Sequence, residues 1–139
     1  MTGPVLVTAA EAVAAQRRAA AGLAALGLRE ADRAAVVATP SSAAYLAVAV
    51  GALRSGVVPV LVNAALTDAE RAVILADADP AVVLGDAELA RLAAFEGPGT
   101  RTMELAPAPR ARAMMYTSGT TGRPKGVWTG LLDEADAAA

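Results

Sequence analysis

The chain has 139 residues, 55% of them hydrophobic, which is enough for one domain with a buried core. A formal net charge of −2 and an aromatic content of only 3% argue against nucleic acid or an anionic membrane surface as a partner. The sequence contains neither cysteine nor histidine, which excludes disulfides, thiolate metal sites and the usual general base.

The first part of the chain predicts a strand followed by a helix. Residues 5–7 are a short apolar run typical of a strand. Thr8 and Glu11 have the spacing of a capping box, which satisfies free N–H groups at a helix start. We expect this helix to run to about Leu26 and to end at Gly27, because glycine readily adopts the left-handed conformation found after a helix.

Two apolar strands with a helix between them come next. Residues 34–38 and 57–62 are apolar runs bounded by polar or turn-forming residues, as in buried strands. The helix is predicted over 43–54, with a serine before it as N-cap and Gly56 after it. Arg54 and Gly56 interrupt the apolar stretch, so we predict no transmembrane helix, which needs about 18 apolar residues in succession.

The following helix leads to a pair of aspartates. Thr67 and Glu70 form a second capping box, which opens a helix to about Ala76. Asp77 and Asp79 come after it. Paired carboxylates can bind a metal or perform acid–base chemistry, but nothing else in the sequence converges on these two, so we predict a polar turn.

Shorter elements lead to the end of this alternating pattern. Residues 81–84 predict a strand, Asp86 is expected to cap a helix that reaches about Phe95, and 102–105 predict one more strand. Short apolar strands that alternate with helices predict an α/β fold of parallel βαβ units with right-handed crossovers. Ligands of such folds bind beyond the carboxyl ends of the strands.

The most informative stretch is 114–127, where a hydroxyl- and glycine-rich loop joins two apolar strands. Glycines let a ligand approach the backbone closely, and successive loop N–H groups can form a concave nest for an anion. The chain's only lysine adds a point charge. We therefore predict a phosphate-binding site. Its residues are Thr117, Ser118, Gly119, Thr120, Thr121, Gly122 and Lys125.

The loop does not have the Walker A pattern, because Pro124 precedes the lysine and Gly126 follows it. Proline disfavours the helical conformation in the residue before it, so we expect the loop to continue into a strand. The alternative interpretation is a solvated turn between two strands.

Residues 116–126, YTSGTTGRPKG, resemble the phosphate-binding signature of the adenylate-forming superfamily. Its members include acyl-CoA synthetases, adenylation domains of peptide synthetases and luciferases. Weaker similarity covers most of the remaining chain, including the glycine, valine and proline stretch at 51–63. Four positions depart from the family pattern: Ala9, Ala12, Ala64 and Gly130. These departures affect packing and loop contacts rather than the motif.

The resemblance implies that residues 1–139 are part of an N-terminal AMP-binding domain. Within it, 1–105 would be a portion of an α/β subdomain, and 113–128 a strand, a phosphate loop and a second strand. Family members carry further motifs downstream that this sequence lacks, so we expect a truncated piece of a longer ligase.

The resemblance also implies a reaction. An AMP-forming acyl-CoA synthetase joins a carboxylic acid to ATP, releases pyrophosphate, and then transfers the acyl group from the acyl-adenylate to CoA. ATP, Mg²⁺ and CoA are the implied cofactors, and the predicted loop residues would hold the β- and γ-phosphates. No catalytic residue and no metal ligand is expected within this chain, so we expect it to be inactive alone.

The remaining expectations follow from context. The N-terminus lacks the pattern of a signal peptide, which with the missing membrane span predicts a cytoplasmic protein. The resemblance implies a role in fatty acid metabolism. CoA is favoured over a carrier protein as acceptor, and the acyl substrate is not identifiable. A truncated sheet would leave an exposed edge for self-association. The alternatives are a non-catalytic α/β module that binds phosphate or a partner protein, and a phosphotransferase that forms ADP.

Overall fold

The computed structural model describes residues 8–39, 42–100, 103–118 and 124–127. These residues contain one five-stranded sheet with the strand order β3-β1-β2-β4-β5. The strands are β1 (Arg33–Val37), β2 (Val58–Val62), β3 (Val82–Leu84), β4 (Met114–Ser118) and β5 (Pro124–Val127). The first four run parallel to their neighbours, and β5 is antiparallel to β4. The predicted α/β fold of parallel βαβ units is confirmed.

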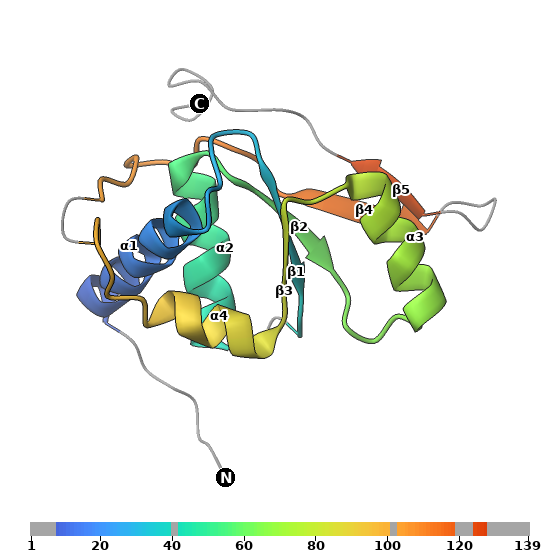
Figure 1. The fold of residues 1–139 in the computed structure, drawn as a ribbon, viewed down its shortest axis with the longest axis horizontal. Helices are drawn as coiled ribbons and strands as arrows, with labels where there is room; N and C mark the ends of the chain where they lie inside the picture. Colours follow the sequence, from blue (N-terminus) through green and yellow to red (C-terminus); the bar gives the residue numbers. More distant parts are fainter. Residues whose placement is uncertain (1–7, 40–41, 101–102, 119–123, 128–139) are drawn as a thin grey trace, which may run out of the picture.

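Helices cover both faces of the sheet. They are α1 (Ala9–Ala25), α2 (Ala43–Ser55), α3 (Asp68–Ala78) and α4 (Asp86–Ala93). Figure 1 shows α1, α2 and α4 together on one side of the sheet and α3 on the other. Two apolar clusters match these layers: one joins β1 and β3 to α1, α2 and α4, and the second joins β1, β2 and β4 to α3.

Strand β1 shows why the sheet is buried on both faces. Ala34 and Val36 belong to the first apolar cluster, whereas Ala35 belongs to the second. Side chains of a strand alternate between faces, so a strand covered on both sides reads as a continuous apolar run rather than an alternating pattern. This is the run from which the strand was predicted.

The helix ends follow from local hydrogen bonds. Thr8 Oγ1 accepts a bond from the Glu11 N–H at 3.1 Å, and Thr67 Oγ1 accepts one from the Glu70 N–H at the same distance. Gly56 ends α2 with a φ angle of 86°, a conformation that costs glycine little. The predicted starts of α1 and α3 and the predicted end of α2 are confirmed.

Three local predictions are wrong. Helix α3 continues to Ala78, so Asp77 lies in its last turn, and Asp79 is its C-cap with a φ angle of 46°. The N-cap of α4 is Gly85 rather than Asp86, and the Gly85 N–H donates to the carboxylate of Glu88 at 3.2 Å. Residues 103–105 are not in a strand, because the chain there runs to the end of α2 without a sheet partner.

Within the described ranges, none of the helices is long and apolar enough to cross a membrane. The strand predicted at 5–7 lies outside the described residues.

Candidate functional site

The two ends of the predicted phosphate motif meet in an antiparallel pair of strands. Thr117 and Ser118 are the last residues of β4, and Lys125 lies in β5. Thr117 pairs with Lys125, and Ser118 pairs with Pro124. The other four predicted site residues, Gly119, Thr120, Thr121 and Gly122, lie outside the described residues. The fold therefore places the first hydroxyl residues of the motif beside its lysine.

The end of β4 projects beyond the strand beside it. Val60 pairs with Met114 and Leu61 with Met115. In this register Tyr116 is level with Val62, where β2 ends, so the next two residues extend past the carboxyl edge of β2. This is the edge at which open parallel sheets bind ligands.

The chain before β4 is fixed to the C-terminal end of α2. The Leu53 carbonyl accepts bonds from the N–H groups of Arg110 and Ala111, at 2.8 and 3.2 Å. The Arg54 guanidinium donates from Nε to the Ala106 carbonyl at 2.7 Å. The two bonds to Leu53 are accepted by a carbonyl in the last turn of α2, and the Arg54 bond holds residue Ala106 beside the same helix end, so together they fix the chain that leads into β4.

Tyr116 directly precedes the predicted site in β4, and the structure describes its side chain. Its hydroxyl donates to Asp77 Oδ2 at 2.6 Å. Burial raises the pKa of Tyr116, and the hydrogen bond to Asp77 and the negative charge of that carboxylate raise it further. The positive charge of Arg33 acts in the opposite direction.

The sequence reading did not find this contact. It ended the helix at Ala76 and treated Asp77 as part of a turn. Helical spacing carries a signal for it, since Asp77 follows the buried Ile74 by three positions and side chains at this spacing share a helix face. Its partner 39 positions later has no local signal.

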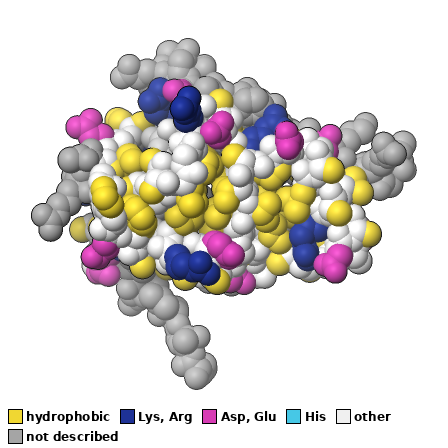
Figure 2. Space-filling model, viewed as in Figure 1, with side chains coloured by type: hydrophobic (Ala, Val, Ile, Leu, Met, Phe, Trp, Pro, Cys, Tyr) yellow, Lys and Arg dark blue, Asp and Glu magenta, His cyan; other side chains and the backbone are white. Residues whose placement is uncertain are grey.

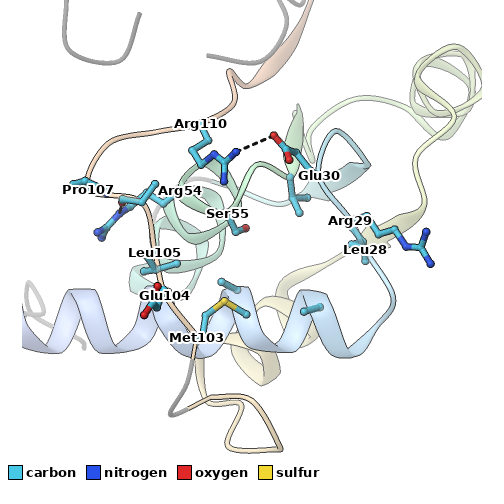
Figure 3. A pocket seen from close by; sticks show the side chains of 14 residues that line it. Leu28, Arg29, Glu30, Arg54, Ser55, Met103, Glu104, Leu105, Pro107 and Arg110 are labelled. Carbon is cyan, nitrogen blue, oxygen red and sulfur yellow. Dashed lines mark hydrogen bonds and ion pairs between the residues drawn. The ribbon is translucent and has the colours of Figure 1, made fainter. Parts of the chain in front are cut away.

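A separate pocket of about 440 Å³ lies at the amino edge of the sheet, away from the motif. Its lining comes from segments that precede β1, β2 and β4, including Glu30, Arg54 and Arg110. Figure 3 shows Arg110 pointing toward Glu30, and the two form an ion pair at 3.2 Å. Because the Arg110 guanidinium is paired with Glu30, the positive charge of Arg110 is already partly offset within the pocket.

Charged side chains of both signs lie around the margin of the face drawn in Figure 2, and hydrophobic side chains form a band across its middle. The described residues contain no group of three or more acidic or histidine side chains that could hold a metal ion.

A family model for AMP-binding enzymes matches residues 3–130. The chain belongs to this family. The match includes the whole predicted phosphate motif, and it confirms the resemblance to adenylate-forming enzymes drawn from that motif.

Solved structures of acyl-CoA synthetases resemble the fold. A structure of o-succinylbenzoate CoA synthetase (MenE) from Bacillus subtilis with ATP and magnesium has a TM-score of 0.75 and 28% identity over 92% of this chain and 38% of that one. MenE with the acyl-adenylate intermediate OSB-AMP has a TM-score of 0.75 and 30% identity over 89% of this chain and 28% of that one.

A Mycobacterium tuberculosis fatty acyl CoA synthetase has a TM-score of 0.71 and 27% identity over 91% of this chain and 29% of that one. The chain therefore spans between 28% and 38% of the length of these three structures. No curated protein matches the chain. The comparisons support an adenylate-forming ligase as the kind of enzyme to which this chain is related.

Proposed function

We propose that this chain is the part of an AMP-forming acid–CoA ligase that holds the β- and γ-phosphates of ATP. The observation that carries the proposal is the β4–β5 pair, in which Thr117 lies beside Lys125 at the carboxyl edge of the sheet. Family membership adds support, and so does the MenE structure with ATP and magnesium.

In the proposed reaction, a carboxylate oxygen attacks the α-phosphorus of ATP. The bond from that phosphorus to the bridging oxygen breaks, and pyrophosphate leaves with the electron pair. The thiol of CoA, as thiolate, then attacks the acyl carbon and displaces AMP, which gives the thioester. The acid would be a fatty acid or another carboxylic acid, and the reaction would belong to cytoplasmic acyl activation.

The proposed role of this chain lies in the first step. The hydroxyl and N–H groups of the motif would donate to the phosphate oxygens, and the Lys125 ammonium would supply positive charge. Donors arranged before the reaction stabilise the charge that develops on the leaving pyrophosphate. Mg²⁺, when bound with the nucleotide, would offset part of the triphosphate charge.

We further propose that a polypeptide of only these 139 residues binds the nucleotide but does not complete the reaction. Catalysis depends on assembled geometry, and this chain spans only 29% of one solved relative and 38% of another. A pyrophosphate-release assay with turnover by the 139-residue chain would contradict this part of the proposal.

The test of the phosphate site compares two charge-removing substitutions. Lys125→Ala is expected to weaken MgATP binding, measured by calorimetry, by about 10- to 150-fold, the range for losing one charge-assisted hydrogen bond. Arg17→Ala is the control, because Arg17 is exposed on α1, a helix that lies far from β5 (Figure 1). Equal affinities for the two variants would refute the phosphate site.

The reaction type is tested with the polypeptide that the gene encodes. ATP-dependent turnover should produce AMP and pyrophosphate in the presence of a carboxylic acid and CoA. Formation of ADP would instead support a phosphotransferase. Absence of both products, with phosphate still bound, would support a non-catalytic module.

A further inference from the structure

The hydroxyl of Tyr116 joins two elements that are distant in sequence. It donates to Asp77 Oδ2 across 2.6 Å, and the two residues are 39 positions apart. This length is in the range of charge-assisted O–H···O⁻ bonds, which are about twice as strong as bonds between neutral groups. The contact links the last turn of α3 to the end of β4.

The Asp77 side chain is exposed, but the helix turn that carries it is fixed by its neighbours. Its neighbours Ile74 and Ala78 are buried in the second apolar cluster, beside Met114 of β4. The Ala78 carbonyl also accepts a bond from the Arg33 guanidinium at 2.9 Å, which ties the end of α3 to the start of β1. The carboxylate therefore projects from a fixed part of the fold rather than from a loose turn.

Tyr116 occupies a central position in the candidate site. Thr117 follows it directly, and Tyr116 pairs with Gly126, the residue after Lys125. A contact that fixes Tyr116 thus acts on both strands of the β4–β5 pair.

We propose that Asp77 is a positioning residue for the phosphate site: its carboxylate holds the Tyr116 hydroxyl and thereby fixes β4 directly before Thr117 and Ser118, its last two residues. The expected effect of Asp77 on ligand binding rests on the proposed function. The structural part, the fixing of the β4–β5 pair, does not require a ligand.

The variants are chosen in matched pairs. Tyr116→Phe removes only the hydroxyl, and Tyr45→Phe removes the other tyrosine hydroxyl of the chain, from α2. Asp77→Asn removes one negative charge, and Asp79→Asn removes the charge two positions later while it keeps a residue that tolerates a positive φ angle. Asp77→Ala removes the acceptor altogether.

The first measurement is hydrogen exchange of backbone amides in the 139-residue chain. We expect Tyr116→Phe and Asp77→Ala to speed exchange in β4 and β5 by about 5- to 10-fold and to leave α1 and α2 unchanged, because the opening is local. The double variant should exchange no faster than either single variant, because both remove the same bond. Exchange in β4 and β5 equal to that of the Tyr45 and Asp79 controls would overturn the proposal.

The second measurement is binding of magnesium pyrophosphate, followed by the fluorescence of Trp128, the only tryptophan. Conditions are chosen in which every variant is folded. Where wild type binds and Lys125→Ala binds more weakly, a loss of affinity of about 5- to 10-fold in Tyr116→Phe and Asp77→Ala supports the positioning role. Wild-type affinity in both variants would overturn the positioning role and leave the proposed function intact. If wild type and Lys125→Ala are alike, the proposed function fails, and hydrogen exchange alone decides whether Asp77 fixes the strands.

Discussion

The contact between α1 and α2 predicts opposite effects for one substitution at two sites. A Cβ atom on Gly51 of α2 would lie 2.6 Å from the backbone oxygen of Gln16 in α1. A Cβ atom on Gly22 of α1 would lie at the same distance from Leu92 Cδ2, the end of a flexible side chain. Backbone cannot move aside as a side chain can, so Gly51→Ala must separate two helices. Gly22→Ala displaces the end of the Leu92 side chain, and its other near atoms, Cγ and Cβ of Phe95, are 3.3 and 3.4 Å away.

The balance between helix propensity and overpacking decides whether each substitution raises or lowers the free energy of unfolding. Glycine to alanine inside a helix gains about 1 kcal/mol from helix propensity. Overpacking of a close contact costs about 1–3 kcal/mol. We expect Gly51→Ala to lower the free energy of unfolding by up to about 2 kcal/mol, and Gly22→Ala to raise it by up to about 1 kcal/mol.

Urea unfolding followed by far-ultraviolet circular dichroism measures both changes on the same chain. The midpoint should move to lower urea for Gly51→Ala and should stay or move to higher urea for Gly22→Ala. The reasoning is refuted if Gly51→Ala stabilises the chain as much as Gly22→Ala does, because the helix backbones would then have room to spare.

Two other predictions concern pH and association. Burial raises the pKa of Tyr45, and burial together with Asp77 raises that of Tyr116, so both favour the folded state below the ordinary tyrosine pKa of about 10. The free energy of unfolding should therefore fall as the pH rises above about 10, and less steeply in Tyr116→Phe; identical slopes would contradict the contact. Val83 is 47% exposed on the edge strand β3, so we expect the chain to self-associate through this edge. Val83→Lys should then raise the monomer fraction in sedimentation. The expectation fails if the wild type is monomeric at all concentrations.

Most of the fold was predictable because its signals are local. The capping residues Thr8 and Thr67 act within three positions, and Gly56 marks a helix end by its own conformation. The wrong N-cap assignment at Asp86 also has a local origin. An acidic residue is common both at the N-cap and in the first turn of a helix, so the sequence does not distinguish the two positions.

The site was predictable only in part. The motif placed a phosphate loop between two strands, and the structure pairs the strands at Thr117 and Lys125. The partner of Tyr116 was not predictable, because Asp77 is separated from it by 39 positions and meets it only after α3 packs on the sheet. Contacts of this kind depend on the register between layers, which no local pattern encodes.

The strand order also has a consequence for how the chain folds. Arg33 pairs with Val58, 25 positions later, whereas Val60 pairs with Met114, 54 positions later. Closing the longer loop costs about 0.7 kcal/mol more in chain entropy, and it orders more residues on the way. We therefore expect β1 and β2 to associate early and β4 to join them late, so that the strands flanking the proposed phosphate motif are added to a core that has already formed.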